Sequence, residues 1–270
     1  MKIMSFNVNG IRARLHQLET VIAKHQPDVI GLQETKVEDS LFPLAFIEEQ
    51  GYNVVFHGQK GHYGVALLYR GTLLNSSKGF PDDGDEAQCR LVSITLATAE
   101  NPVTIYNGYF PQGESRSHPT KFANKAEFYQ NLTRLLQQHQ PSENLIVLGD
   151  MNVAPLDKDI GIGEDNRKRW LRTGKCCFLP EERQWLQELS AWGLVDSYEQ
   201  QHPQDGAQRY SWFDYRSGGF SANPRRGLRI DLILATPAVI NRQRACEIDQ
   251  DIRAMEKPSD HCPVWLEAEL

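Results

Sequence analysis

Apolar and polar residues follow two periodicities along the chain, and these distinguish predicted strands from predicted helices. Short apolar or alternating runs predict strands at 2–8, 28–33, 52–56, 65–69, 91–96, 103–109, 146–148, 208–213, 229–235 and 264–269. Apolar residues at intervals of three and four predict helices at 15–25, 125–139 and 180–192. Pro27 follows the first of these helices and stops it, because proline has no amide hydrogen to donate.

The order of these elements predicts the fold class. Strands and helices are interspersed, and neither a Gly/Ser linker nor a block of charge divides the 270 residues. Segments 52–56 and 65–69 read as a hairpin, and 91–96 with 103–109 as a second strand pair. We therefore predict one domain over 1–270, with an α/β fold of four layers: two mixed β-sheets packed face to face with helices outside.

Polar residues stand at the ends of many predicted strands. In IVLGDMNVAP (146–155), for example, an apolar run ends in an acid and an amide. The residues of this kind are Asn7, Glu34, Tyr109, Asp150, Asn152, Asp231, Asp260 and His261. Each alone reads as a solvated turn. So many polar tips on apolar strands favour a shared site instead, because ligands of α/β sheets gather at strand ends.

The residue types in this set point to one kind of chemistry. Carboxylates and amides without thiolates are the hard oxygen ligands that suit Mg²⁺ or Mn²⁺. Glu34 is the first choice as a direct ligand, followed by Asp260. The sequence has neither a phosphate-binding GxxxxGK[ST] loop nor a serine in a nucleophile elbow. We therefore predict metal-assisted attack by water on a phosphodiester.

His261 can be a structural histidine or a catalytic one. It follows Asp260 and precedes the last predicted strand. A carboxylate from another strand, Asp231, would orient its ring by binding the second nitrogen. In that arrangement, a positively charged His261 would contact the scissile phosphate.

Composition narrows the class of protein. The net charge is −6, which argues against a non-specific DNA coat but is compatible with an enzyme that has a local basic rim. Five cysteines without CxxC spacing suit reduced thiols. We also see neither an apolar run of membrane-spanning length nor the apolar core of a secretory signal, and we expect a cytoplasmic protein without membrane contact.

Nine stretches together resemble the exonuclease III/abasic endonuclease family of the DNase I-like superfamily. In chain order they are SFNVNG, DVIGLQETK, GHYGVALL, NGYFPQGE, GDMNVAP, NRKRWLRTGK, SWFDYR, GLRID and KPSDHCPVW. They extend from residue 5 to residue 265, in the family's order. The resemblance implies that the strand-end residues converge in one cleft that binds a divalent cation.

The resemblance also implies a role for each residue. Glu34 would bind the metal, with Asn7 nearby and Asp260 at a second metal position. Asp150 would activate water or protonate the leaving group, and this choice stays open. Asn152 and Tyr109 would bind the phosphate, and His261, oriented by Asp231, would stabilise the pentavalent phosphorus. The residues expected around the metal are Asn7, Glu34, Asp150, Asn152, Asp260 and His261.

Substrate contacts are expected in two places. Trp212, Leu228 and Ile230 would wall a pocket for a sugar without its base, whereas Phe213 is expected in the core. The basic run at 166–175 would contact the DNA backbone. Its expected contact residues are Arg167, Lys168 and Arg169, with Gln112 and Arg90 as weaker candidates.

The resemblance implies an Mg²⁺-dependent DNA repair nuclease that acts as a monomer on duplex DNA. It would cut 5′ to abasic sites, remove 3′-blocking groups as a phosphodiesterase and phosphatase, and degrade ends as a 3′-to-5′ exonuclease. Two alternatives stay open: a phosphatase of lipid or inositol phosphates, and a scaffold that binds DNA ends without catalysis. The pocket residues and basic run disfavour the first, and the full set of polar tips disfavours the second.

Overall fold

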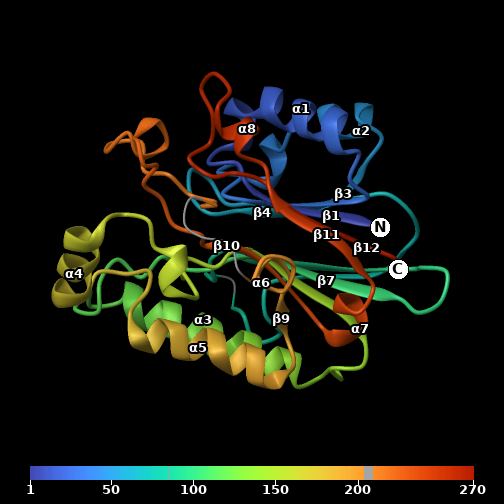
Figure 1. The fold of residues 1–270 in the computed structure, drawn as a ribbon. Coiled ribbons are helices and arrows are strands. Elements are labelled where there is room, and N and C mark those ends of the chain that lie inside the picture. The colour runs from blue at the N-terminus through green and yellow to red at the C-terminus, as the bar shows by residue number, and fades with distance from the viewer. Residues whose placement is uncertain (85, 204–208) are drawn as a thin grey trace.

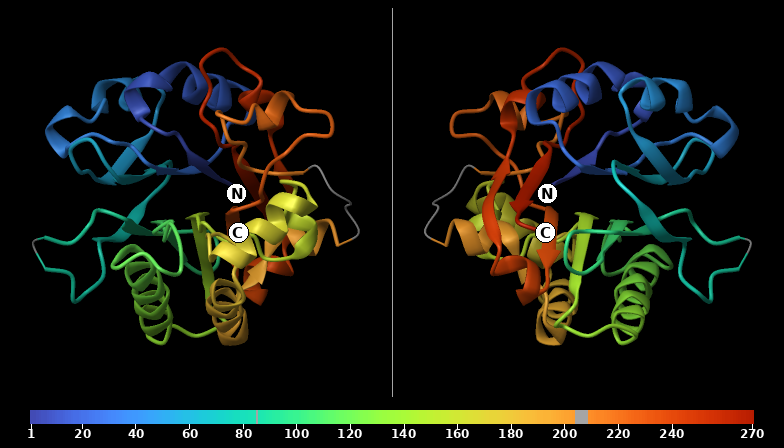
Figure 2. Two further views of the ribbon diagram at one scale, coloured as in Figure 1. Left: turned by 90° about the vertical axis from the view of Figure 1, so that its left-hand side faces the viewer. Right: turned by 90° about the vertical axis from the view of Figure 1, so that its right-hand side faces the viewer.

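Two six-stranded mixed sheets stacked face to face form the centre of the molecule (Figure 1). The computed structural model describes residues 1–84, 86–203 and 209–270. Apolar side chains from both sheets meet between them, among them Ile3, Val65, Val92, Ile146 and Val264. Helices cover the two outer faces, so the four predicted layers are confirmed (Figure 2).

The first sheet has a parallel pair at its centre. Its strands, in spatial order, are β11 (Gln243–Ile248), β12 (Val264–Ala268), β1 (Lys2–Asn7), β2 (Val29–Gln33), β4 (Val65–Tyr69) and β3 (Asn53–His57). Strands β1 and β2 run parallel, and α1 (Leu15–His25) connects them. The outer face of this sheet is covered by α1, α2 (Leu44–Glu49) and α8 (Gln250–Arg253) (Figure 1).

The second sheet repeats this plan. Its strands, in spatial order, are β5 (Leu73–Lys78), β6 (Leu91–Leu96), β7 (Val103–Tyr109), β8 (Asn144–Asp150), β10 (Asp231–Ala235) and β9 (Val195–Asp196). The parallel pair here is β7 and β8, joined by α3 (Lys121–Leu136). Helices α3 and α5 (Pro180–Trp192) lie side by side on the outer face (Figure 1). Because both faces are covered, every residue of β8 is buried.

Shorter elements occupy the edges and the connections. They are α4 (Glu164–Thr173), α6 (Ser197–Gln201), α7 (Pro237–Ile240) and the 3₁₀ turns Ile11–Ala13, Asp39–Leu41, Asp157–Asp159 and Gly219–Ser221. In the part of the chain that the structure describes, no helix combines the length and apolar character needed to cross a membrane.

Strand register brings the polar tips together. In the first sheet, Asn7 pairs with Gln33, so the next residue, Glu34, emerges beside it. In the second sheet, Asp150 lies between Tyr109 on one neighbouring strand and Asp231 on the other. The ends of β1, β2, β7 and β8 and the start of β10 therefore meet at one end of the sandwich.

Most predicted elements are confirmed, and some bounds change. The helices at 15–25 and 180–192 and both predicted strand pairs are present. The helix predicted at 125–139 instead spans Lys121–Leu136, because it begins directly after Thr120 and its last turn closes at Gln137. Strands β5, β9 and β11 and helices α2 and α4 were not predicted. Strand β5, for example, exposes nearly every side chain and is held by pairing with β6.

The strand predicted at 208–213 is wrong. Residue 208 lies outside the described residues, and the rest of the segment forms only isolated bridges, from Trp212 to Leu228 and to His261. The segment crosses between two neighbours instead of following one. The amide of Ser211 donates to Leu228, whereas that of Phe213 donates to the carbonyl of Asp260. Phe213 itself is fully buried, as predicted.

Candidate active site

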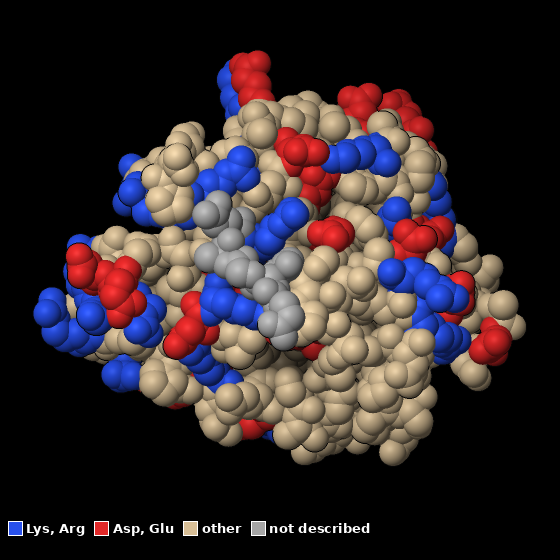
Figure 3. All heavy atoms as spheres, in the orientation of Figure 1, with Lys and Arg blue, Asp and Glu red and all other residues tan. Residues whose placement is uncertain are grey.

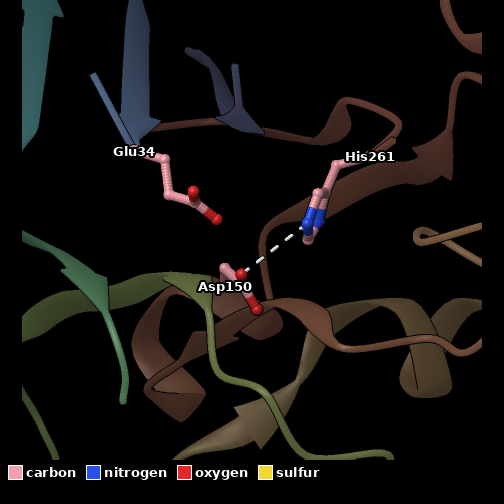
Figure 4. A group of neighbouring side chains, drawn as sticks. All are labelled: Glu34, Asp150 and His261. Carbon is pink, nitrogen blue, oxygen red and sulfur yellow. Dashed lines mark ion pairs between the residues drawn. The ribbon is translucent and has the colours of Figure 1, made fainter. Parts of the chain in front are cut away.

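Three side chains from distant parts of the chain converge at the meeting point of the strand ends. Glu34 follows β2, Asp150 ends β8, and His261 precedes β12. One oxygen or nitrogen from each lies within 4.8 Å of the others. All three point into a common space in Figure 4. This group contains three of the residues expected around a metal ion.

Asn7 and Lys36 hold Glu34 in its ionised form. The Asn7 side-chain amide donates to Glu34 and to Asp150, at 2.9 Å in both cases. The Lys36 ammonium lies 2.7 Å from the other Glu34 oxygen. Burial alone would raise the pKa of Glu34, but Lys36 and Asn7 together lower it below its ordinary value. A carboxylate that stays charged in a buried site is suited to bind a cation.

Asp150 is the most deeply buried carboxyl of the group. Gly149 precedes it, and a Cβ there would lie only 1.9 Å from the Gly108 carbonyl oxygen, so this position requires glycine. The main-chain N–H of Asn152 donates to the Asp150 carboxyl at 3.1 Å. Burial raises the pKa of Asp150 to about 8, although His261 opposes that shift. Asp150 can therefore exchange a proton near neutral pH.

His261 lies between two acids. Its Nδ1 is 2.8 Å from the nearer oxygen of Asp231, and its Nε2 is 3.8 Å from Asp150 (Figure 4). Burial alone lowers the pKa of His261, but Asp231 and then Asp150 reverse this and raise it to about 10. The predicted pairing of His261 with Asp231 is thus present, and the imidazole carries a positive charge at neutral pH.

Tyr109 and Asn152 complete the polar floor of the site. Burial and the Glu34 carboxylate keep the pKa of Tyr109 well above its ordinary value, so the phenol remains a hydrogen-bond donor. Asn152 has a left-handed backbone with φ of 52° and donates from its side chain to the Phe110 carbonyl at 3.0 Å. Its amide group is therefore fixed in place, with one N–H still free for another acceptor.

Asp260 lies outside the three-residue group. Asn9 donates to one of its oxygens at 2.8 Å, and the Trp212 indole donates to the other at 3.1 Å. Asn9 in turn accepts a hydrogen bond from Lys36 at 2.5 Å. These hydrogen bonds connect Glu34, through Lys36, to the wall of the adjacent pocket, and the second metal position at Asp260 stays a prediction.

A cavity of about 720 Å³ opens above these groups. The predicted site residues that line it are Glu34, Tyr109, Gln112, Asp150, Asn152, Arg169, Trp212, Leu228, Ile230, Asp260 and His261. Asn7 and Asp231 lie behind this surface and hold the residues that form it. One wall, formed by Trp212, Leu228 and Ile230, is apolar, as the resemblance implied.

Three predicted substrate contacts do not reach this cavity. Arg167 and Lys168 on α4 face Glu164, at 2.8 and 3.5 Å respectively. Arg90 is buried beside the site, where its guanidinium lies 4.7 Å from the Tyr109 ring centre and donates to the Tyr109 carbonyl. Their side chains contact Glu164 and Tyr109 and not the cavity.

Sequence reasoning missed several residues of the cavity wall. Arg216 and Arg226 add two cations to it, beside Lys175, the last residue of the predicted basic run. Figure 3 shows Lys and Arg side chains gathered around α4 at the edge of the molecule. Arg216 ends the stretch SWFDYR, so its nearness to Trp212 offered a usable signal. Arg226 offered none, because its position depends on a loop that folds back so that its amide donates to Gly219.

Comparisons with known proteins identify the family. The sequence model of the endonuclease/exonuclease/phosphatase family matches residues 4–261. The chain belongs to this family. It is 55% identical to exodeoxyribonuclease III of Haemophilus influenzae over 99% of both proteins. The family is metal-dependent, in agreement with the acidic group at the strand ends.

Solved structures support the same assignment. A Neisseria 3′ phosphatase bound to a product DNA hairpin matches the whole chain with a TM-score of 0.89 at 36% identity. An AP endonuclease from Archaeoglobus fulgidus gives a TM-score of 0.90 at 33% identity, again over the full length of both chains. The sandwich of two sheets is therefore the fold of this family's DNA-processing members.

Proposed function

We propose that the protein is an Mg²⁺-dependent DNA repair nuclease that hydrolyses phosphodiesters of duplex DNA. It would cut 5′ to abasic sites, remove 3′-blocking groups and digest ends in the 3′-to-5′ direction. The observation that carries this proposal is the convergence of Glu34, Asp150 and a charged His261 beneath an apolar-walled cavity. A relative that is 55% identical over nearly its full length bears the name exodeoxyribonuclease III.

The donor set fits a hard divalent cation. Glu34 and Asp150 offer carboxylate oxygens within reach of a common point, and the five cysteines lie outside this group. We assign Glu34 as the main ligand, with Asp150 beside it and Asn7 nearby, where its side-chain N–H groups hold both carboxyl groups. Mg²⁺ is the expected ion and Mn²⁺ a substitute. When bound, the cation neutralises phosphate charge and stabilises the leaving oxygen.

The chain's own donors hold the phosphate. The charged His261 would donate from Nε2 to a non-bridging oxygen, since Nδ1 is occupied by Asp231. The free N–H of Asn152 and the Tyr109 hydroxyl would donate to the remaining oxygens. These groups are fixed before substrate arrives, so they stabilise the growing negative charge without rearranging.

Asp150 is the group that we assign to proton transfer. Its carboxyl lies beside the proposed metal position, where it would accept a proton from water or supply one to the leaving oxygen. The neighbouring Asn7 and Asn152 donors fix the carboxyl in one orientation. Both directions of transfer use the same position, so the choice between them does not alter the proposed reaction.

The cavity supports selection of damaged sites. Its apolar wall of Trp212, Leu228 and Ile230 would accept a sugar that lacks its base. Rotating such a nucleotide out of the duplex costs least where base pairing is already lost. Arg169 and Lys175, also on the cavity wall, would contact flanking phosphates. The apolar wall and these cations disfavour a lipid or inositol phosphate substrate.

We further infer that residues 1–270 form one catalytic domain that works as a monomer in the cytoplasm. The site draws on both sheets, so neither half contains a complete set of catalytic residues. Five free cysteines suit a reducing compartment.

One assay tests the proposal. Purified protein is incubated with end-labelled duplex that carries one abasic site, with Mg²⁺ or with a chelator, and Glu34→Gln serves as the control. Incision that requires both Mg²⁺ and Glu34 is expected. Tight binding without incision would favour the scaffold, and release of phosphate from inositol lipids alone would favour the other phosphatase.

A further inference from the structure

A lysine ammonium lies completely buried behind the phosphate-binding loops. The side chains of Lys125 on α3 and Glu182 on α5 are both 0% exposed, and their charged groups lie 2.5 Å apart. Moving two charges out of water costs free energy that their mutual attraction often fails to offset. A buried pair of this kind is therefore weak as a source of stability, and its other contacts indicate its use.

The remaining contacts of this ammonium all lead toward the site. Lys125 donates to the main-chain carbonyl of Asn152 at 2.8 Å and to that of Gln112 at 3.3 Å. The side chains of both residues line the cavity. One buried cation thus holds two loops from the rear, while the side chains of those loops face the substrate.

Glu182 extends the same connection to a third segment. Its second oxygen accepts a hydrogen bond from the Leu179 amide at the start of α5, at 2.8 Å. The carbonyl of Cys177, two residues earlier, accepts from Ala154 on the Asn152 loop at 2.8 Å. The Cys177 thiol lies 3.7 Å from the Asn152 side-chain oxygen. Three segments that surround Asn152 are therefore joined to α3 and α5, which pack together (Figure 1).

The conformation of Asn152 requires such support. Its φ of 52° lies in the left-handed region, which is less favourable than the ordinary helical and extended regions, although asparagine tolerates it better than other non-glycine residues do. Contacts from the surroundings offset the remaining cost. The bond from Lys125 to the Asn152 carbonyl acts on the residue that carries this cost.

We propose that Lys125 is a positioning residue for Asn152, kept in place by Glu182. The pair does not touch substrate; it fixes the main chain so that the Asn152 amide faces the phosphate. Burial alone lowers the pKa of Lys125, but Glu182 outweighs this effect and keeps the ammonium charged. This inference rests on the proposed function, since it gives Asn152 a phosphate to bind.

The test separates positioning from simple stability. Lys125→Met alone leaves a buried carboxylate without its partner and is expected to destabilise the fold. The double variant Lys125→Met/Glu182→Met replaces both charges with apolar groups of similar length, a change that often preserves stability. Lys121→Met, on the same helix but 57% exposed, is the matched control.

Two measurements decide the outcome. In the folded double variant, kcat on an abasic duplex should fall about 10- to 100-fold, with KM changed less than about threefold. Adding the Lys125→Met and Glu182→Met substitutions to Asn152→Ala should lower kcat little further, because all of these changes remove the same interaction. Normal kcat in the double variant would overturn the proposal. So would a double substitution that lowers kcat by the same factor in the wild type and in Asn152→Ala.

Hydrogen exchange gives a readout that does not depend on activity. Amides of residues 150–154 should exchange at least tenfold faster in the double variant than in Lys121→Met. Unchanged exchange there would overturn the inference even if the enzyme were inactive for other reasons. Failure of the wild-type protein to incise DNA would instead count against the proposed function, so the two failures remain distinct.

Discussion

The residues of the site adopt conformations that most side chains avoid. Glu34, Lys36, Asn9 and Asn152 have positive φ values between 45° and 55°. Each such residue costs about 1 kcal/mol or more, and each is held here by polar contacts with its neighbours. The strand ends thus turn sharply enough to aim short polar side chains into one space, with little freedom left for them to move away.

Asp231→Asn tests the charge of His261. An amide cannot stabilise the imidazolium as a carboxylate does, so the pKa of His261 should fall from about 10. We expect kcat to drop about 10²- to 10³-fold, since a charged donor to the phosphate is lost. The imidazolium exists below its pKa, so the activity remaining in the variant should decline at a lower pH than in the wild type. A pH–rate series on an abasic duplex measures both effects, and near-normal turnover would refute the role.

At the scale of elements, the cations of α4 and of Lys175, which follows the helix, have two tasks. Glu164 in the first turn of the helix binds Arg167 and Lys168 along its exposed side. Arg169 and Lys175 instead line the cavity, and Lys175 lies 4.1 Å from the Trp170 ring centre. The sequence did not predict this helix, because none of its ten residues is buried and so it lacks a regular apolar face. The register of the helix places Arg169 at the cavity and Arg167 and Lys168 beside Glu164.

We expect Arg169→Ala/Lys175→Ala to weaken DNA binding and reduce its salt dependence. Each phosphate contact contributes about 0.9 to the slope of log K against log salt, so the loss should approach two units. The matched control is Arg167→Ala/Lys168→Ala, whose slope should change less. Binding is measured with chelator present, so that DNA is not cut, over a range of salt concentrations. Equal slopes for the two variants would contradict this division of tasks.

At the scale of the whole molecule, one ion cluster joins distant parts of the chain. Asp249, before α8, accepts hydrogen bonds from Lys24 at 2.9 Å and His25 at 2.6 Å, both at the end of α1. Burial alone would raise the pKa of Asp249, but His25 and Lys24 lower it to about 2. More than two hundred residues separate these partners, so only the folded molecule provides this stabilisation.

Asp249→Asn should lower the free energy of unfolding by about 1 kcal/mol at pH 7, after allowance for solvent screening. The folded-state pKa is depressed, so in the wild type this contribution is present above pH 4 and disappears as pH falls toward 2. The two proteins should therefore become more alike in stability on acidification. Asp251→Asn is the control, because Asp251 shares Lys24 but is 87% exposed. Urea unfolding over a pH series checks the result, and a constant difference at all pH values would refute it.

Local sequence determined the elements whose signal is local. Segments 15–25 and 180–192 show apolar residues at helical spacing, and their predicted bounds agree with the structure. Apolar strands that end in Asn7, Glu34 and Asp150 also carried the metal-site prediction, because a polar residue after a buried strand stands out in the sequence itself. Motifs distributed over the chain are sufficient to indicate the family.

Tertiary structure decided what depends on contacts between distant segments. The sequence does not say that Asp260 accepts hydrogen bonds from Asn9 and Trp212, or that Arg90 lies buried against the Tyr109 ring. Strand β5 and segment 209–213 owe their form to their neighbours more than to their own residues. Hydrophobic periodicity reports which face of an element is buried, whereas a polar side chain's partner is set by the three-dimensional arrangement of strands and loops.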